Sequence, residues 1–490
     1  MTVYQTIKQI KNYAEQGYKM APLYTTLFAD IRTPIEIFRI LKNISKHCFI
    51  LESAEDTKNW GRYTFIGFDP MLEITCLNGI LQIKQNTIKQ IITPKPSIVL
   101  RKVLQQYKSP RIDDLPPFSG GLMGYFSFDY IRYIETSIHL SGNDEENFKD
   151  LDLMMFHKII AFDHYLQKIF IIINISLQDV DLSYQKGYEE LTELTDLIKY
   201  GKIPPEVPGK RTSDYNYLFD KSTYCKMVEH TKKYIYEGDV FQAVLSNRAQ
   251  ATYEGSLLNT YRVLRTTNPS PYMFYMASDD VEITGASPET LVKLKDRIIS
   301  TFPLAGTRKR GKNEQEDLLL EQTLRQDEKE CAEHNMLVDL GRNDIGKISE
   351  FGSVKVTKYM NIERFSHVMH LGSTVQGKLR EDKDALDAID ATLPAGTLSG
   401  APKLRACEII SKLENNKRGI YGGAIGYIDM TGNMDMCIAI RLVFKKNNKV
   451  FIRSGAGIVA DSIPKNEYHE CIQKAKAVMQ ALQAAEEIRI

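Results

Sequence analysis

The sequence predicts an α+β (mixed α/β) protein with a strand-rich first part and a second part in which helices alternate with strands. Short apolar runs bounded by Gly, Pro, Asn and Asp dominate the first 200 residues, whereas apolar residues at helical spacing recur after residue 220. A polar, Pro-containing stretch separates the two parts. At 490 residues, of which 43% are hydrophobic, the chain is long enough to bury a large core in two or three domains.

Six segments of the first part are typical of strands, because β-branched and aromatic residues dominate them and turn residues separate them. They are residues 47–55, 61–68, 71–84, 121–130, 157–163 and 167–175. The last two segments form a hairpin-like pair. Helices are expected to be the minority in this part of the chain.

The stretch YGKIPPEVPGKRTSDYN is typical of an exposed connection, because Pro, Gly and polar residues replace the apolar pattern. We therefore place a domain boundary at residues 200–215. This predicts a strand-rich regulatory or structural domain over residues 1–205 and a second domain over residues 216–486. Gly-rich and charge-rich segments concentrate in the second domain, so we expect it to carry the catalytic site.

Three segments of the second part have helical periodicity. The first is an amphipathic helix near residues 222–237, with Ser222 or Thr223 as its N-cap. Residues 316–344 predict one continuous helix. Residues 461–488 predict a last helix that starts at Asp461 or Ser462, with Pro464 in its first turn.

Charge and cysteine content exclude several classes of protein. The 63 Lys and Arg residues balance 62 Asp and Glu residues, so neither nucleic acid nor an anionic membrane is an expected partner. The longest strongly apolar run, residues 169–175, is far shorter than the roughly 20 residues of a membrane helix. Seven scattered cysteines without a CxxC pair, and an N-terminus without an apolar signal core, predict reduced thiols in a cytoplasmic protein.

Two pairs of glutamates lie on the predicted helices. Glu330 and Glu333 share one helix face, and Glu467, Glu470 and Lys474 line a stripe of the last helix. A single pair of this kind is usually a solvated helix face. Because both helices also carry apolar stripes that must pack, we expect the four carboxylates to converge and to bind a hard cation such as Mg²⁺. Zn²⁺ is disfavoured, since His and Cys are absent at ligand spacing.

Several motifs in a fixed order make the chain resemble the chorismate-utilising enzymes, a family that includes anthranilate, aminodeoxychorismate, isochorismate and salicylate synthases. Individually the Gly-rich motifs are also compatible with tight turns. The motifs are GASPE (285–289), PLAGTRKRG (303–311), AEHNMLVDLGRNDIG (332–346), MHL (369–371), PAGTLSGAPK (394–403), YGGAIGY (421–427), IAIR (438–441) and SGAGIVADS (454–462). The resemblance implies the chorismate-utilising enzyme fold, with β-sheets packed face to face and helices on the outside.

The resemblance also implies functional residues. The matching Mg²⁺ ligands are Glu333 and Glu470, with Glu330 and Glu467 alongside through water. Glu289 matches the acid that protonates the departing C4 hydroxyl, and His370 matches a histidine needed for loss of pyruvate. The positions that match substrate contacts are Gly306, Thr307, Thr397, Tyr421, Arg441, Gly455, Ala456, Gly457 and Lys474. Without the resemblance, Arg441 reads as a surface arginine and His370 as a buried core histidine.

Two positions distinguish the branches of the family. Ala305 stands where aminodeoxychorismate synthases carry a nucleophilic lysine, and Gln242 stands where the water-using members carry a basic lysine. Both departures favour direct addition of ammonia at C2 and formation of anthranilate. The alternatives are an aminodeoxychorismate synthase and an enzyme that stops at 2-amino-2-deoxyisochorismate. A further alternative is an inactive regulatory subunit with the same fold, although every metal and substrate position is filled.

The resemblance implies a partner and an effector. Because the chain contains no glutaminase segment, we expect ammonia from a separate glutamine amidotransferase subunit in a hetero-oligomer. The segments Ile50–Ser53 and Asn268–Met273 match those of the members inhibited by L-tryptophan, which implies an effector site formed by Glu52, Ser53, Pro271, Tyr272 and Met273. A strand end that meets a Pro-rich turn is the alternative interpretation of these segments. A nucleotide site is excluded, since no P-loop or dinucleotide-binding motif is present.

Overall fold

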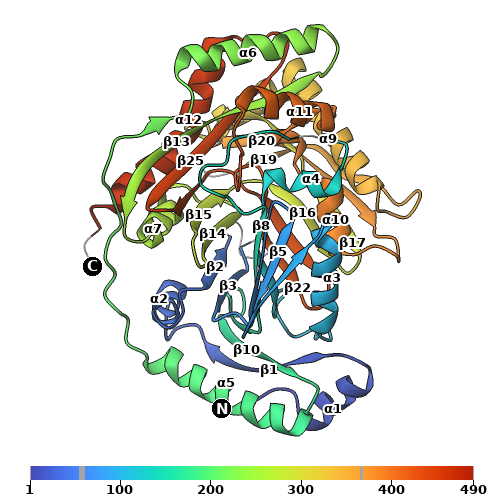
Figure 1. Ribbon diagram of the computed structural model, residues 1–490, viewed down its shortest axis with the longest axis vertical. Coiled ribbons are helices and arrows are strands. Elements are labelled where there is room, and N and C mark those ends of the chain that lie inside the picture. The colour runs from blue at the N-terminus through green and yellow to red at the C-terminus, as the bar shows by residue number, and fades with distance from the viewer. Residues whose placement is uncertain (1, 54–60, 139, 365–367, 489–490) are drawn as a thin grey trace.

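Two large antiparallel β-sheets pack face to face, and helices cover their outer faces (Figure 1). The computed structural model describes residues 2–53, 61–138, 140–364 and 368–488. The predicted α+β class and the face-to-face arrangement of the sheets are therefore confirmed. All six predicted strand segments of the first part contain strands, and residues 158–163 and 168–176 form the expected hairpin.

The first sheet, sheet A, contains thirteen strands among the described residues. In spatial order they are β1 (Met20–Phe28), β10 (Lys168–Ser176), β9 (Lys158–Asp163), β3 (Tyr63–Phe68), β2 (Cys48–Glu52), β14 (Tyr272–Ala277), β15 (Glu282–Ser287), β24 (Leu442–Lys446), β25 (Lys449–Ile458), β13 (Gln242–Glu254) and β11 (Lys210–Arg211), with β12 (Asn216–Tyr217) and β21 (Gly400–Ala401) also paired to β13.

The second sheet, sheet B, contains twelve strands over the same described ranges. Their order is β18 (Leu304–Lys309), β20 (Val368–Lys378), β17 (Ile298–Thr301), β16 (Thr290–Lys295), β23 (Met434–Ile438), β22 (Ala424–Asp429), β7 (Gly121–Phe126), β8 (Leu151–Phe156), β4 (Leu72–Leu77), β5 (Ile80–Lys84) and β6 (Ile88–Ile92), with β19 (Lys355–Arg364) paired to β20.

Both sheets contain strands from both sides of the predicted boundary at residues 200–215. In sheet A, β2 pairs with β14, and in sheet B, β7 pairs with β22. The connection itself follows helix α5 (Val180–Tyr200) and holds only the short strands β11 and β12. The division into residues 1–205 and 216–486 stays a prediction, and the hydrogen-bonded ladders run across it.

Three apolar layers explain this arrangement. A central layer rich in Phe and Tyr lies between the sheets, and one apolar cluster lies under the helices on each outer face. Helices α1 (Ile7–Glu15), α2 (Pro34–Ile44), α5, α7 (Leu258–Thr267) and α12 (Pro464–Ala485) cover sheet A. Helices α3 (Pro96–Gln106), α4 (Ile131–Ile134), α9 (Glu328–Gly346) and α10 (Ala385–Thr392) cover sheet B. The remaining helices are α6 (Lys221–Tyr236), α8 (Glu314–Arg325), α11 (Lys403–Glu414) and the 3₁₀ turns at Phe128–Tyr130 and Gly396–Leu398.

The structure corrects three helix predictions. The single helix predicted over residues 316–344 is two helices, α8 and α9, because the Asp327 side chain caps α9 by accepting the Glu330 N–H. Helix α6 is capped by Asp220, which accepts the Thr223 N–H, and not by Ser222 or Thr223. Helix α12 begins directly at Pro464 without a side-chain cap.

All seven cysteines are free thiols, five of them buried, which agrees with the predicted absence of disulfides. No helix in the described ranges has the length and apolarity that a membrane crossing requires.

An ion-pair cluster joins the two sheets at one edge. His47, just before β2, lies with Nε2 2.9 Å from Glu73 Oε1 on β4 and 2.9 Å from Asp279 Oδ1 after β14. Lys84 Nζ on β5 lies 2.6 Å from Asp279 Oδ2. Because the Lys84 ammonium already pairs with these carboxylates, the cluster is an ion-pair network and not a metal site. The Glu73 hydrogen bond raises the pKa of His47 above its ordinary value.

We expect His47→Ala to lower the free energy of unfolding mainly at acidic pH. A raised histidine pKa contributes stability that is fully present below the unfolded value of about 6.5 and is lost as pH rises through the higher folded value. The difference is expected to be about 1 kcal/mol or less, since solvent screens the pair. Urea unfolding of both proteins between pH 5 and pH 9 measures it, and a difference that does not shrink with pH contradicts the assignment.

Candidate active site

A cavity of about 810 Å³ contains nearly all of the predicted catalytic, substrate and metal positions. Its walls come from β13, β18, β20 and β25 and from helices α9 and α12. The predicted residues that line it are Gln242, Glu289, Gly306, Thr307, Glu330, Glu333, His370, Thr397, Tyr421, Arg441, Gly455, Gly457, Glu467, Glu470 and Lys474. Sequence segments more than 200 residues apart therefore meet in one hollow, which is the arrangement that the two glutamate pairs predicted.

Glu289 lies where the chain crosses from one sheet to the other. Strand β15 of sheet A ends at Ser287, strand β16 of sheet B begins at Thr290, and only Pro288 and Glu289 connect them. Burial raises the pKa of Glu289 to about 7, against the opposing effects of the Thr397 hydroxyl and of the Arg441 and Lys474 charges. The Thr397 hydroxyl donates to Glu289 Oε1 at 3.2 Å. A carboxyl of this kind is protonated near neutral pH and can act as a general acid.

Arg441 is the cation best placed to bind an anion in this cavity. Its side chain has no hydrogen-bond or ion-pair partner in the described part of the chain, and it lines the cavity with Glu289. Its φ of 51° is unusual for a residue other than glycine and marks a position held by its surroundings. Lys474 differs, because its ammonium lies 2.7 Å from Glu470 and donates to the Gly455 carbonyl at 3.2 Å.

His370 on β20 is held in one tautomer. Its Nδ1 lies 2.8 Å from the Gly306 carbonyl oxygen and 3.1 Å from the Thr307 hydroxyl. Since a carbonyl only accepts, Nδ1 carries the proton and Nε2 carries the lone pair. Burial lowers the pKa of His370, so the ring is neutral at pH 7 and can accept a proton at Nε2.

The four glutamates line the cavity as two like-charged pairs. Burial and the neighbouring Glu333 raise the pKa of Glu330, and burial raises the pKa of Glu467 together with the neighbouring Glu470. Such pairs favour a bound cation, and their donor atoms are all hard carboxylate oxygens. Among the described residues, His47, Glu73 and Asp279 form the group whose ligand atoms all lie within 4.8 Å of one another. The cavity glutamates form no such group of three among the described residues, so their carboxylates are spread more widely.

Glycines allow close packing around the cavity. A Cβ on Gly457 would lie 2.4 Å from Gln242 Nε2, and a Cβ on Gly455 would lie 2.6 Å from the Leu245 carbonyl and 3.0 Å from the Tyr421 hydroxyl. Gly306 has a φ of 64°, and a Cβ there would lie 3.3 Å from Glu330 Oε2. Side chains at these positions would therefore displace the groups that surround the cavity.

Ala456 differs from its two neighbours on β25. Its side chain belongs to an apolar cluster with Leu245 and Cys471 and is fully buried, so it does not line the cavity. The reason is the alternation of a strand, which turns Ala456 to the face opposite Gly455 and Gly457. Only the backbone of Ala456, and not its side chain, can therefore contact a substrate in the cavity.

Two parts of the cavity wall were not predicted from the sequence. Lys329 on α9 lines the cavity, and its charge opposes the rise in the pKa of Glu467. Residues 268–271 also line the cavity, although the sequence suggested an effector role for this segment. The position of Lys329 between the two pairs could have been noticed from its place next to Glu330 on a predicted helix.

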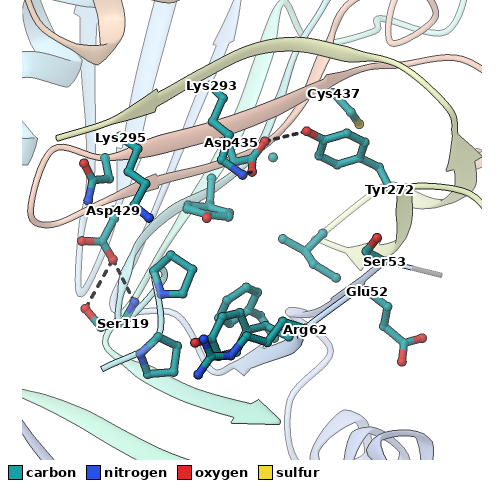
Figure 2. A pocket seen from close by; sticks show the side chains of 18 of the residues that line it. Glu52, Ser53, Arg62, Ser119, Tyr272, Lys293, Lys295, Asp429, Asp435 and Cys437 are labelled. Atoms are coloured by element: carbon teal, nitrogen blue, oxygen red, sulfur yellow. Dashed lines mark hydrogen bonds and ion pairs between the residues drawn. The ribbon is translucent and has the colours of Figure 1, made fainter. Parts of the chain in front are cut away.

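A second cavity of about 530 Å³ lies between the two sheets (Figure 2). Strands β2, β3 and β14 of sheet A and strands β16, β22 and β23 of sheet B supply its walls. All five predicted effector residues, Glu52, Ser53, Pro271, Tyr272 and Met273, line it. Pro271 lines both cavities, so the two hollows share a wall.

The Glu52 side chain binds groups outside the second cavity. Although Glu52 borders the second cavity, its side chain points away from it (Figure 2). The carboxylate pairs with Arg265 Nε at 2.5 Å and Nη2 at 2.9 Å, and it also accepts from the Tyr261 hydroxyl. Both partners lie on α7, so the alternation of β2 turns Glu52 toward the helix layer while Ser53 faces the cavity. The effector role of Glu52 stays a prediction.

A family model described as chorismate binding enzyme matches residues 46–480 of the chain. The chain is 41% identical to anthranilate synthase component 1 of Acetivibrio thermocellus, over 99% of this chain and 100% of that protein. It is 42% identical to anthranilate synthase component 1 of Aquifex aeolicus (strain VF5), over 99% of each chain.

Two solved structures are also similar to this chain. The crystal structure of anthranilate synthase component I from Streptococcus pneumoniae TIGR4 is similar with a TM-score of 0.75 and 40% identity, over 85% of this chain and 92% of that chain. The menaquinone-specific isochorismate synthase from Escherichia coli is similar with a TM-score of 0.70 over 97% of this chain and 99% of that chain. Its 18% identity supports a shared fold alone.

Proposed function

Since this chain belongs to the family of chorismate-binding enzymes, we propose that it converts chorismate and ammonia into anthranilate, pyruvate and water, as an oxo-acid lyase of tryptophan biosynthesis. The observation that carries the proposal is the joint placement of Glu289, Arg441 and the two glutamate pairs in one cavity. Ala305 and Gln242, the two positions that distinguish the branches of the family, also line this cavity and carry no basic or nucleophilic amine.

The substrate carries two carboxylates, and the cavity offers groups for both. Arg441 can form forked hydrogen bonds with one carboxylate, and Lys474 and the glycine-bordered strand β25 offer further charge and N–H groups. We assign Mg²⁺ binding to Glu333 and Glu470, with Glu330 and Glu467 alongside. When bound, the ion supplies positive charge that holds the ring carboxylate of chorismate.

Proton transfers are assigned to two side chains. Ammonia adds with its lone pair at C2, the ring π electrons shift, and the C4–O bond breaks as Glu289 protonates the departing hydroxyl to give water. In the second stage His370 Nε2 takes the C2 proton, the C3–O bond breaks, and pyruvate leaves as its enolate, whose methylene carbon takes up one proton and so balances the proton that His370 removed. The ring then becomes aromatic, and the products balance chorismate plus ammonia.

The ammonia source is assigned to a separate glutamine amidotransferase subunit. The relatives from Acetivibrio thermocellus and Aquifex aeolicus are each named component 1, which supports a second component. Free ammonia is mostly ammonium at neutral pH, so a direct path between the two subunits increases its delivery. A cytoplasmic location stays a prediction, supported by seven free thiols.

The decisive experiment is incubation of the purified chain with chorismate, Mg²⁺ and an ammonium salt, followed by chromatography of the products. Fluorescent anthranilate with an equal amount of pyruvate is the expected result. A 4-amino product indicates the aminodeoxychorismate synthase branch, and accumulation of 2-amino-2-deoxyisochorismate indicates an enzyme that omits the second stage. A complete lack of turnover supports the inactive regulatory subunit.

We also propose that L-tryptophan inhibits this chain by binding in the cavity between the sheets. The cavity is large enough for an amino acid with an indole ring, and Ser53, Pro271, Tyr272 and Met273 border it. Its walls combine apolar rings with polar groups such as Ser53 and Asp435 (Figure 2). The shared wall at Pro271 offers a short route from this cavity to the catalytic one.

Replacing Ser53 by phenylalanine is expected to relieve inhibition by tryptophan while kcat without tryptophan stays within about twofold of the wild type. The larger ring fills part of the second cavity and does not reach the catalytic one. Inhibition curves from 1 μM to 10 mM tryptophan, a range of about four decades around ordinary effector affinities, measure the shift. An unchanged curve for Ser53→Phe removes Ser53 from the effector site.

A further inference from the structure

Three side chains join the two sheets beside Glu289. The Tyr272 hydroxyl on β14 lies 2.8 Å from Asp435 Oδ1 on β23 and 2.8 Å from the Thr290 hydroxyl at the start of β16. Because the Asp435 carboxylate only accepts, Tyr272 donates to it and Thr290 donates to Tyr272. Lys293 Nζ lies 2.7 Å from Asp435 Oδ2 and completes the chain of polar contacts.

These contacts connect the second cavity to the catalytic acid. Tyr272 and Asp435 line the cavity between the sheets, where Figure 2 draws their hydrogen bond, and Thr290 directly follows Glu289 in the sequence. The Glu289 backbone is also tied to sheet B, since its carbonyl accepts the Ile438 N–H at 2.9 Å. A register shift between Thr290 and Val292 leaves one extra residue in β16 at this point.

The position of Glu289 therefore depends on how the sheets are held together. The crossover of Pro288 and Glu289 is short, and the Thr290–Tyr272–Asp435 contacts cross the space between the sheets next to it. A ligand that fills the cavity between the sheets presses on both of its walls. Because Tyr272 belongs to one wall and Asp435 to the other, such a ligand changes these contacts directly.

We propose that Thr290, Tyr272 and Asp435 form a positioning chain that holds Glu289 in place for proton transfer and passes occupancy of the cavity between the sheets on to it. This inference rests on the proposed lyase activity and on tryptophan as the effector. None of the three residues contacts the reacting atoms, so each acts through the position of Glu289. The positioning chain predicts that a mutation can reduce inhibition by tryptophan without reducing tryptophan binding.

Thr290→Val tests the positioning chain, since valine keeps the shape of threonine and removes its hydroxyl. Without tryptophan, kcat is expected to fall about tenfold with KM changed by less than about twofold, because a small displacement of a catalytic group lowers the rate strongly. Tryptophan binding by calorimetry is expected to stay within about threefold of the wild type, whereas the factor by which saturating tryptophan lowers kcat/KM shrinks about fivefold or more.

Three further variants exclude a general loss of structure. Thr290→Ser restores the hydroxyl and is expected to restore both kcat and inhibition. Tyr272→Phe removes the same hydrogen bond from the other side and is expected to lower kcat by a similar factor. Thr284→Val is the matched control, because the Thr284 hydroxyl on β15 is fully buried and donates to the Phe274 carbonyl at 3.1 Å without bordering either cavity.

The outcomes separate the two proposals. The positioning chain is overturned if the wild type makes anthranilate and is inhibited by tryptophan, and Thr290→Val has the same kcat and the same inhibition factor as the wild type. The positioning chain is also overturned if kcat falls as much in Thr284→Val as in Thr290→Val, since the loss then comes from sheet packing in general. A wild-type chain that makes no anthranilate contradicts the proposed function instead.

Discussion

Replacing Glu289 by glutamine is expected to lower kcat for anthranilate formation by about 10²–10⁴-fold. Glutamine keeps the size of the side chain and its hydrogen bond with Thr397 but has no acidic proton for the departing hydroxyl. KM is expected to change little, because the amide removes a proton donor and not a contact with the carboxylates. Steady-state kinetics with ammonium as the nitrogen source measures this, and a variant with more than about a tenth of wild-type kcat contradicts the role of Glu289.

The pH dependence of the wild type gives an independent measurement of the same group. Burial raises the pKa of Glu289 to about 7, so the carboxyl is protonated below this value and ionised above it. Because the acid form is the active form, kcat at saturating ammonia is expected to fall as pH rises through about 7. In Glu289→Gln this alkaline limb is expected to disappear.

Removing the Glu470 carboxylate is expected to abolish Mg²⁺-dependent turnover. Glu470→Ala takes away one of the two assigned inner ligands and leaves Glu333 with Glu330 and Glu467 alongside, so Mg²⁺ affinity is expected to fall about 10–100-fold or more. Titration of Mg²⁺ by calorimetry in the absence of substrate measures the affinity directly. Activity assays over rising Mg²⁺ then show whether a high concentration restores part of the turnover.

Glu328→Ala is the matched control for this variant. Glu328 is an exposed carboxylate in the first turn of α9, close in sequence to Glu330, but it does not line the cavity. Its removal changes the net charge by the same amount and is expected to leave Mg²⁺ affinity unchanged. Equal losses in both variants argue against a specific ion site and point to a general electrostatic effect.

The catalytic cavity was largely predictable from the sequence, because its residues lie in short motifs that keep a fixed order. Glu330 and Glu333 share a helix face by spacing alone, and the last helix carries Glu467 and Glu470 in the same way. Their convergence needed only the argument that both helices bury apolar stripes. Lys329 escaped this reasoning, since a lysine beside glutamates on a helix usually forms a surface ion pair.

The cavity between the sheets was less predictable, and Glu52 shows why. The sequence places Glu52 and Ser53 side by side, but it does not say which face of β2 is turned to the space between the sheets. Arg265 and Tyr261 on α7 decide this by binding the carboxylate on the helix side. Likewise, the break between α8 and α9 depends on the Asp327 cap, which helical periodicity alone does not reveal.

The pairing of β2 with β14 and of β7 with β22 has a consequence for synthesis of the chain. When the first 200 residues leave the ribosome, β3 and β8 can pair with one edge of β2 and of β7, but the other edge of each strand has no partner, because β14 and β22 are made much later. Unpaired edges of apolar strands bind one another and aggregate, and ladders between distant segments form slowly. The N-terminal segment expressed alone therefore lacks the strands that complete its sheets, and biogenesis of the whole chain depends on keeping early strands apart until translation is nearly finished.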